Sequence, residues 1–425
     1  MKSVRVSVGS DTERVEPAYG LHTYQRQVLD DLMCVLRPNP QDIVPTSQRA
    51  IVHMPTGAGK TRVACHAACS LLSRAQAEGK VVVWLASTEE LCDQAADDLR
   101  KAWSVLGNRP IDIYRFWGDS SLDLAELESG FLVAGMPKLW AVSGKDVRLM
   151  RNLAEVTAGV IFDEAHQAIA RTYRYLTEQL LTYQPPLLGL TATPERTATV
   201  SDPDHELAQM FGSNKVTIDS RGHGDPVTYL IKQEFLADPS FSRIEVSSQV
   251  RFTEPKDGFD YGPKELYELG EDETWRKAIV DVTVSALGRY SRTMVFCPSV
   301  QSVRECAEAI RNRGLRAEVV LGETSDENRR CSIERFKDDS TEPIALFNYN
   351  VLTAGFDAPR TKCVVIGRPT TSLVLYSQMM GRAMRGRQSG GNLTCQIYTV
   401  IDTNLPGFGS VAEAFSNWEE LWRQE

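Results

Sequence analysis

The chain has 425 residues, of which 42% are hydrophobic and 24% are charged, and its formal net charge is −9. This length has room for two or three domains, and the composition is typical of a globular protein in water. The acidic balance excludes a uniformly basic molecule, so any nucleic-acid surface must be a local patch. No apolar run is long enough to span a bilayer and the first residues lack the apolar core of a signal peptide, so we expect no membrane partner.

The sequence contains nine cysteines and no paired C-x-x-C clusters. This usage predicts reduced thiols and a cytoplasmic location. Cys65, His66 and Cys69 lie close enough in the sequence to suggest a metal site. We favour a structural interpretation, because they fall on an expected helix after a glycine-rich loop, where cysteine packs as a small apolar residue.

Short β-rich runs alternate with helical stretches from about residue 19 onward, which is typical of βαβ units and a parallel sheet. Continuous apolar runs indicate strands that are buried on both faces. The expected strands are residues 49–54, 80–86, 158–163, 187–192, 293–297, 316–321, 343–348, 362–367 and 395–401. The sequence therefore predicts an α/β fold built on parallel sheets.

The alternation of β-rich and helical stretches is weaker in the middle of the chain, where Pro, Gly, Asp and Ser are frequent. We therefore expect a first domain over residues 19–200, a linker or insertion over residues 201–274 and a second domain over residues 275–405. An N-terminal segment, residues 1–18, precedes the first domain. Helical spacing of aromatic residues predicts a C-terminal helix over residues 406–425.

A glycine-rich loop follows the first expected strand. Residues 54–61 read Met-Pro-Thr-Gly-Ala-Gly-Lys-Thr and match G-x-x-x-x-G-K-T when Pro55 replaces the leading glycine. A chance Gly-Lys-Thr in a surface turn is the alternative, but a strand before and a helix after favour a loop that holds phosphates at a helix N-terminus. Lys60 would reach the β- and γ-phosphates and Thr61 would bind Mg²⁺. The predicted ATP-binding residues of the loop are Pro55, Thr56, Gly57, Ala58, Gly59, Lys60 and Thr61.

Two carboxylates follow the apolar strand at residues 158–163. Asp163 stands at the strand end and is suited to hold Mg²⁺, while Glu164 is suited to orient and deprotonate an attacking water. A solvated acidic strand end is the alternative. Two carboxylates in a chain that already has a phosphate loop favour the catalytic interpretation.

Two arginines lie more than 200 residues further along, in the string Gln378-Met-Met-Gly-Arg-Ala-Met-Arg385. We expect Arg382 and Arg385 to stand one helical turn apart and to face one cleft with Gln378. Gly381 suggests a close backbone approach. An exposed basic helix end is the alternative, but phosphoryl transfer needs positive charge on its transition state. The predicted catalytic residues are Lys60, Asp163, Glu164, Gln378, Arg382 and Arg385.

These strings in this order resemble the two-lobe motor core of helicase superfamily 2, and the resemblance covers about residues 19–402. It implies two tandem RecA-like P-loop domains with ATP between them. Residues 21–25 look like the adenine-reading Q motif, with Tyr24 and Gln25 on the nucleotide. His166 completes a DEAH form of motif II. The resemblance implies that His166 couples the lobes, and that Thr191 and Thr193, in a string that looks like motif III, couple hydrolysis to the strand.

Other family motifs imply contacts with a nucleic-acid strand or with the nucleotide. The implied strand contacts are Ser87, Thr88, Gln94, Pro298, Ser299 and Thr353, and the implied nucleotide contacts of motif V are Gly355 and Asp357. Motif Ib departs from the family, because Gly135 and Met136 stand where a threonine is expected. Ser87 replaces the proline of motif Ia.

Motifs V and VI look closest to the branch that contains type III restriction translocating subunits, and the Gln-Met-Met-Gly-Arg form of motif VI favours DNA over RNA. The resemblance implies an ATP-dependent DNA helicase or translocase that uses Mg²⁺, binds nucleic acid without sequence preference and works with protein partner subunits, in a setting such as antiviral defence or repair. Two alternatives stay open: an RNA-dependent helicase, and a non-processive ATP-gated switch subunit of a larger complex.

Overall fold

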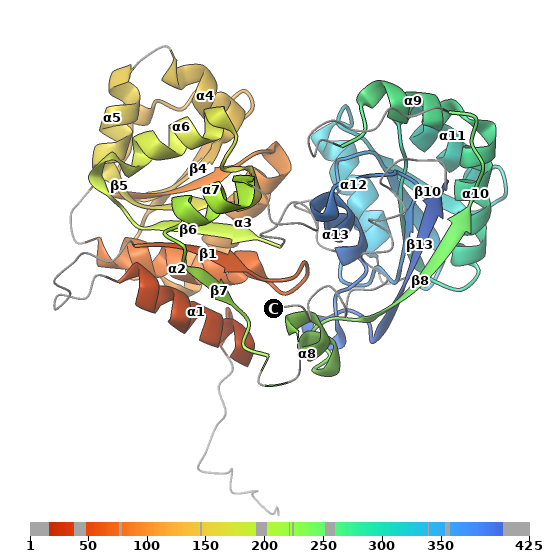
Figure 1. The fold of residues 1–425 in the computed structure, drawn as a ribbon, viewed down its shortest axis with the longest axis horizontal. Helices are drawn as coiled ribbons and strands as arrows, with labels where there is room; N and C mark the ends of the chain where they lie inside the picture. The colour runs from red at the N-terminus through yellow and green to blue at the C-terminus, as the bar shows by residue number, and fades with distance from the viewer. Residues whose placement is uncertain are drawn as a thin grey trace, which may run out of the picture.

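The computed structural model describes residues 17–37, 48–75, 79–144, 147–192, 202–220, 222, 225–250, 260–338, 340–352 and 358–402. Within these residues the chain forms two parallel sheets, one in each lobe of the molecule (Figure 1). Helices cover the sheets, as expected when parallel strands are joined by crossovers. This architecture confirms the predicted α/β fold with two parallel-sheet domains.

The first sheet has seven strands in the order β3-β4-β2-β5-β6-β1-β7. Its strands are β1 (Arg49–His53), β2 (Val81–Ala86), β3 (Asp112–Phe116), β4 (Gly130–Gly135), β5 (Thr157–Phe162), β6 (Leu187–Thr191) and β7 (Lys215–Thr217). The helices of this lobe are α1 (Thr23–Leu36), α2 (Lys60–Arg74), α3 (Glu89–Leu106), α4 (Met136–Ser143), α5 (Val147–Val156), α6 (Arg171–Leu180) and α7 (Asp202–Met210). Every residue of the interior strand β2 is buried, which explains its continuous apolar run.

The second sheet has six strands in the order β10-β11-β9-β12-β13-β8. Its strands are β8 (Asp238–Glu245), β9 (Arg292–Phe296), β10 (Arg316–Val320), β11 (Ile344–Asn348), β12 (Cys363–Ile366) and β13 (Thr394–Ile401). The helices are α9 (Pro263–Glu271), α10 (Glu273–Leu287), α11 (Val300–Arg311), α12 (Asp326–Lys337) and α13 (Leu373–Gly381). Helix α8 (Pro226–Lys232) lies between the lobes (Figure 1).

The segment expected as a linker or insertion contributes an edge strand to each sheet. Strand β7 pairs with β1 in the first sheet, and β8 pairs with β13 along its full length in the second. Neither strand has a strong sequence signal, because β7 has three residues and β8 is exposed or half-buried throughout. We propose that the boundary between the lobes falls between Thr217 and Asp238.

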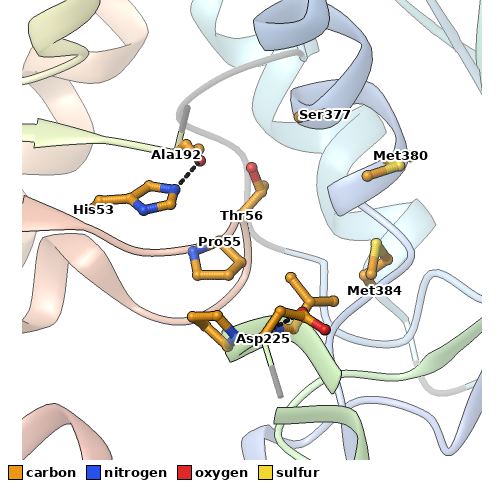
Figure 2. Close-up of a pocket in the computed structure, with 10 residues that line it drawn as sticks. His53, Pro55, Thr56, Ala192, Asp225, Ser377, Met380 and Met384 are labelled. Atoms are coloured by element: carbon orange, nitrogen blue, oxygen red, sulfur yellow. Dashed lines mark hydrogen bonds between the residues drawn. The ribbon is translucent and has the colours of Figure 1, made fainter. Parts of the chain in front are cut away.

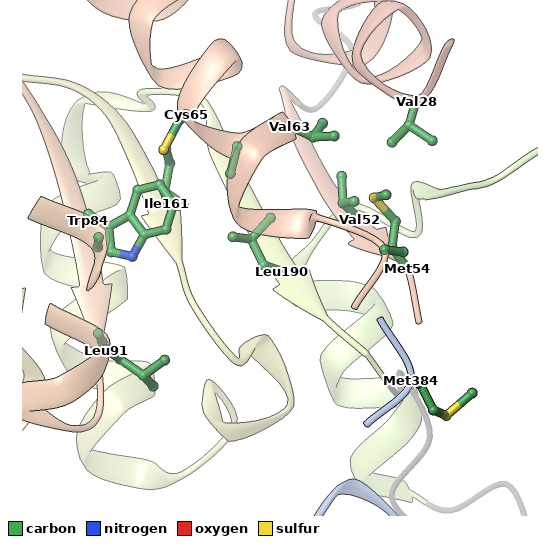
Figure 3. Close-up of a cluster of buried hydrophobic side chains, with 14 of the residues drawn as sticks. Val28, Val52, Met54, Val63, Cys65, Trp84, Leu91, Ile161, Leu190 and Met384 are labelled. Atoms are coloured by element: carbon green, nitrogen blue, oxygen red, sulfur yellow. The ribbon is translucent and has the colours of Figure 1, made fainter. Parts of the chain in front are cut away.

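Apolar packing is continuous from one lobe into the other. One cluster of buried side chains joins the α1–α2 face of the first sheet to residues of the second lobe such as Met384 (Figure 3). Two further clusters fill the other face of each sheet. The lobes therefore share a desolvated contact beside the phosphate loop, whose preceding residue Met54 belongs to the same cluster.

All nine cysteines are free thiols, as the sequence predicted. Cys65 and Cys69 are buried in the packed face of α2, in agreement with their structural interpretation. Among the helices in the described part of the chain, none combines the length and apolar character needed to cross a membrane.

Candidate nucleotide site between the two lobes

The glycine-rich loop connects the end of β1 to the start of α2. Gly57 and Gly59 have φ angles of +86° and +83°, which favour glycine. A Cβ on Gly59 would also lie 2.3 Å from Nε2 of Gln25. Lys60 is the first residue of α2, so the loop presents a helix N-terminus, where unpaired N–H groups and the helix dipole favour an anion.

Helix α1 holds this loop from behind. The Tyr24 hydroxyl and the Gln25 amide both donate to the carbonyl oxygen of Ala58, at 3.0 Å and 2.9 Å. The Gln25 side-chain oxygen accepts from the backbone N–H of His22 at 3.0 Å. Both ends of the Gln25 amide are therefore engaged, and the shape of the loop depends on α1.

The two predicted carboxylates follow β5 and are buried. The backbone N–H of Asp163 donates to the carbonyl of Leu85 at 2.9 Å, and its carboxylate accepts from the N–H of Glu164 at 3.0 Å. Glu164 has a left-handed backbone with φ of 52°, which is uncommon outside glycine and is found at functional sites. Nδ1 of His166 lies 3.4 Å from a carboxylate oxygen of Glu164.

Charges in this cluster alter one another's protonation. Burial raises the pKa of Asp163, and the neighbouring Glu164 carboxylate raises it further, while Lys60 opposes both effects. Burial lowers the pKa of Lys60, against the pull of Glu164 and Asp163. The Lys60 ammonium donates to the carbonyl of Met54 at 3.1 Å.

The arginine-bearing segment differs from its prediction. Helix α13 ends at Gly381, so Arg382 caps the helix and Arg385 lies beyond it, paired with Leu236 in an antiparallel bridge. The predicted relation of one helical turn between the two arginines is therefore wrong. The turn after the helix nevertheless directs both arginines into the same cleft.

Gly381 confirms the close approach that the sequence suggested. A Cβ at this position would lie 2.2 Å from Cγ2 of Thr56, which belongs to the glycine-rich loop of the other lobe. The side chain of Thr56 therefore packs directly against the backbone of Gly381, so the two lobes touch at the phosphate loop.

One cleft of about 1240 Å³ contains the predicted catalytic residues of both lobes. The residues that line it include Gln25, Thr56, Gly57, Gly59, Lys60, Thr61, Asp163 and Glu164 from the first lobe and Gln378, Arg382 and Arg385 from the second. Pocket volumes of roughly 300–1,000 Å³ suffice for drug-sized ligands, so the cleft has room for a nucleoside triphosphate. Basic side chains thus face a buried carboxylate pair across it.

A smaller cavity of about 20 Å³ lies beside the cleft, between both lobes and α8 (Figure 2). Pro55 and Thr56 line it from the loop, and Ser377, Met380 and Met384 line it from the second lobe. The residue Pro55, which departs from the loop pattern, therefore lies at the contact between lobes.

His53 also lines this cavity, and its ring Nε2 is 3.0 Å from the carbonyl oxygen of Ala192 (Figure 2). Burial lowers the pKa of His53 to about 3, and Lys215 and Lys60 contribute in the same direction. Its ring is therefore neutral near pH 7.

The structure adds cleft residues that sequence reasoning missed. Tyr19 and Arg62 line the same cleft as Gln25, and the Arg62 guanidinium lies 4.4 Å from the centre of the Tyr19 ring. Glu90 of α3 and Arg329 of α12 form an ion pair across the cleft at 3.0 Å. The only sequence signal for Tyr19 is its position just before the Q motif, and none pointed to the ion pair.

Of the predicted motif III residues Thr191 and Thr193, the structure describes Thr191. Thr191 is buried at the end of β6, where its carbonyl accepts from the N–H of Met54 at 3.2 Å. This bond connects β6 to the start of the phosphate loop. The remaining positions Thr193, Thr353, Gly355 and Asp357 lie outside the described residues.

The predicted strand contacts divide into three groups. Thr88 is exposed and caps α3, with Ser87 half-buried beside it, so both are accessible. Gln94 lines the cleft itself. Pro298 and Ser299 are buried, and Ser299 caps α11 by accepting from the N–H of Ser302. We correct the expectation for these last two, because their side chains are not accessible to a strand.

Two protein families match this chain in separate regions. Residues 18–196 match the family described as type III restriction enzyme, res subunit. Residues 276–387 match the helicase conserved C-terminal domain. The first region contains the phosphate loop and the carboxylates, and the second contains the arginines.

Curated relatives include two that carry the names of ATP-dependent helicases. IRC3 of Saccharomyces cerevisiae is 24% identical over 400 residues, covering 91% of this chain and 52% of IRC3. The mitochondrial irc3 of Schizosaccharomyces pombe is 26% identical, covering 84% of this chain and 54% of that protein. A 51.5 kDa protein of a Lactococcus phage is 27% identical, covering 61% of this chain and 54% of its own length. This chain therefore spans about half the length of these relatives.

Solved structures show the same fold at low identity. Dbp5 of S. cerevisiae bound to RNA and ADP BeF3 has a TM-score of 0.60 and 13% identity, covering 96% of this chain and 98% of Dbp5. The DUF1998 helicase MrfA bound to DNA has a TM-score of 0.63 and 15% identity, covering 94% of this chain and 48% of MrfA. The likeness supports two tandem RecA-like domains.

Proposed function

We propose that this chain, a superfamily 2 helicase, is an ATP-dependent DNA helicase or translocase. The observation that carries the proposal is the composition of the cleft: a phosphate loop and a carboxylate pair from one lobe face two arginines from the other. A site divided in this way is complete only when the lobes are together. Hydrolysis can therefore be coupled to movement of one lobe against the other.

In this mechanism Lys60 and the loop N–H groups bind the β- and γ-phosphates. Glu164 accepts the proton of the attacking water, and its buried position beside His166 fixes the direction of its carboxylate. Arg382 and Arg385 stabilise the charge that develops on the transferred phosphoryl group. Gln378 lines the cleft on the same side and would orient the γ-phosphate or the water.

The donor set fits a magnesium ion. The Thr61 hydroxyl and the Asp163 carboxylate belong to residues that line one cleft, and Mg²⁺ in phosphoryl-transfer sites is held by one or two protein oxygens together with substrate phosphates. Burial beside Glu164 raises the pKa of Asp163, a cost that a divalent cation would offset. When bound, the ion would neutralise charge on the phosphate oxygens.

The base of the nucleotide would lie near α1. Gln25 and Tyr24 bind the Ala58 carbonyl, so a base that contacts Gln25 would also act on the phosphate loop. Tyr19 with Arg62 forms the neighbouring wall. Motif V, with Gly355 and Asp357, would complete the nucleotide contacts.

Nucleic acid would cross both lobes, contacting Ser87 and Thr88 in the first and Thr353 in the second, mainly through phosphates and so without sequence preference. The form of motif VI and the match to restriction subunits support DNA. A close approach explains the departure in motif Ib, because a Cβ on Gly135 would lie 2.9 Å from Cβ of Trp117. Partner subunits, a defence or repair setting and a cytoplasmic location stay predictions.

ATP turnover measured against a panel of single-stranded, duplex and forked DNA and RNA tests the proposal. We expect stimulation by DNA that weakens steeply between two salt concentrations, as phosphate contacts do. Stimulation by RNA alone would replace DNA with RNA as substrate. Turnover without strand or triplex displacement would favour the ATP-gated switch, and no turnover with any nucleic acid would contradict the proposal.

A further inference from the structure

The chain that enters β8 is bound to the arginine-bearing segment of the second lobe. The N–H of Ala237 donates to the Met384 carbonyl at 2.8 Å, and the N–H of Gly386 donates to the Phe235 carbonyl at 3.1 Å. Leu236 and Arg385 pair in an antiparallel bridge. Residues 234–237, which we term the connecting segment, therefore move with Arg385.

Because residue 386 is glycine, its backbone can approach the backbone of the connecting segment closely. A Cβ there would lie 2.3 Å from the carbonyl oxygen of Glu234. The N–H of Gln388 donates to the same Glu234 carbonyl at 3.0 Å. Backbone bonds on both sides of Arg385 thus fix its position relative to the connecting segment.

The side chains of the same segment contact the first lobe. The Phe235 ring centre lies 4.6 Å from that of His22 and 4.7 Å from that of Tyr24, both in tilted geometry. Leu236 is buried, and a Cβ on Gly57 would lie 3.2 Å from its Cδ2. The partners of Phe235 are not peripheral, because Tyr24 binds the phosphate loop at Ala58.

We propose that Phe235 is a positioning residue for ATP turnover. It is held to the arginine-bearing segment by backbone bonds, and its ring packs against the α1 residues that support the phosphate loop. It therefore sets where Arg385 stands relative to Lys60. Phe235 does not line the nucleotide cleft, so it would act through Arg385 and not by contact with ATP. This inference rests on the proposed function.

Removing the ring should change turnover more than nucleotide affinity. Phe235→Ala leaves Tyr24 and Gln25 on Ala58, so we expect the dissociation constant of a fluorescent ADP analogue to stay within about threefold, whereas kcat should fall roughly 10- to 100-fold, the scale of an ångström-sized misplacement. Phe235→Tyr keeps the ring and should restore most of kcat. Phe241→Ala is the matched control, because Phe241 lies on β8 and is 37% exposed.

A second measurement does not depend on hydrolysis. Cys34 in α1 is exposed and Cys331 in α12 is half-buried, while the other seven cysteines are buried, so dyes on these two report the distance between lobes. With a non-hydrolysable ATP analogue we expect a single narrow distance in the unmodified protein and in Phe241→Ala. In Phe235→Ala the distribution should broaden.

The outcomes separate this inference from the proposed function. A wild-type protein without turnover would remove the proposed function, yet the distance measurement would still test Phe235. Unchanged kcat and an unchanged distance distribution in Phe235→Ala would overturn the inference. Equal losses of kcat and nucleotide affinity would also overturn it, because they indicate a merely structural role. Should Phe235→Ala not fold, Phe235→Leu keeps apolar volume without the ring and should show an intermediate loss of kcat.

Discussion

The two lobes are joined in different ways on the two sides of the cleft. Beside α8, a buried apolar cluster and the Phe235 ring connect them, and backbone hydrogen bonds hold the segment that carries Phe235 to the second lobe. Across the cleft, Glu90 and Arg329 form an ion pair whose side chains are 29% and 20% exposed. The buried contacts beside α8 are shielded from water, whereas a partly exposed ion pair is weak and is screened by salt.

This difference indicates a fixed side and an opening side. Movement between the lobes should pivot near α8 and widen the gap between α3 and α12 (Figure 1). Arg385 lies on the fixed side, where it pairs with Leu236 of the connecting segment. The cleft can then open about this side to exchange nucleotide, and closure brings the arginines and the phosphate loop together again.

The largest expected effect comes from removing an arginine that lines the cleft. Arg382→Ala should lower kcat by roughly 10³- to 10⁵-fold, the range for an arginine that stabilises phosphoryl transfer. Arg387→Ala is the control, because Arg387 is exposed five residues further on. Turnover assays with saturating nucleic acid give the comparison. A loss below tenfold would place Arg382 outside the catalytic set.

A smaller effect follows from separating the lobes where Gly381 contacts the Thr56 side chain. Gly381→Ala puts a methyl group against Thr56 and should disfavour the closed arrangement by about 1–3 kcal/mol, or roughly 5- to 150-fold in turnover. Gly144→Ala has no heavy atom within 4 Å of the added carbon and serves as control. Equal rates in both variants would show that Gly381 and Thr56 separate during the cycle.

Acid should lower the free energy of unfolding through His53, which lines the small cavity on the fixed side. Burial lowers the pKa of His53 to about 3 in the folded protein, so the folded state disfavours the protonated ring. The contribution of the neutral ring to the free energy of unfolding is therefore complete above the ordinary pKa near 6.5. It decreases by about 1.4 kcal/mol per pH unit as the pH falls below that value. Denaturant unfolding between pH 7.5 and pH 5 should show a weaker pH dependence for His53→Asn. His205→Asn, at an exposed histidine, should keep the full dependence. An unchanged slope in His53→Asn would contradict this account.

The smallest effect is expected at the opening side. Glu90→Gln should cost about 1 kcal/mol or less in lobe closure, and the difference from wild type should vanish in high salt. Asp281→Asn is the matched control, because it removes exposed pairs with Lys277 and Arg313 that both lie inside the second lobe. The distance between dyes on Cys34 and Cys331 measures closure. If the difference in lobe distance between Glu90→Gln and wild type did not depend on salt, the side with the ion pair would not be the opening side.

Much of the site could be predicted because its chemistry is local. A phosphate loop needs a strand, two glycines with positive φ and a helix N-terminus, and these are contiguous in residues 49–61. The carboxylate pair likewise follows directly from the apolar strand β5. Contacts made by residues close in sequence are visible as patterns.

The features that the sequence did not predict depend on contacts between residues far apart in the chain. The end of α13 at Gly381 and the pairing of Arg385 with Leu236 are set by tertiary packing, so spacing alone wrongly extended the helix. Phe235 stands in a segment whose composition is typical of a linker, and its partners lie more than 200 residues earlier. Ser299 is buried and caps α11, and its position after a strand did not reveal either feature.

The most direct test of the central claim is a structure of the Glu164→Gln variant with ATP, Mg²⁺ and duplex DNA. The variant should bind ATP without turning it over, since the general base is removed. We predict the Arg382 and Arg385 guanidinium groups on the γ-phosphate, with Phe235 still packed on His22 and Tyr24. Arginines directed away from a triphosphate bound at Lys60 would contradict the account.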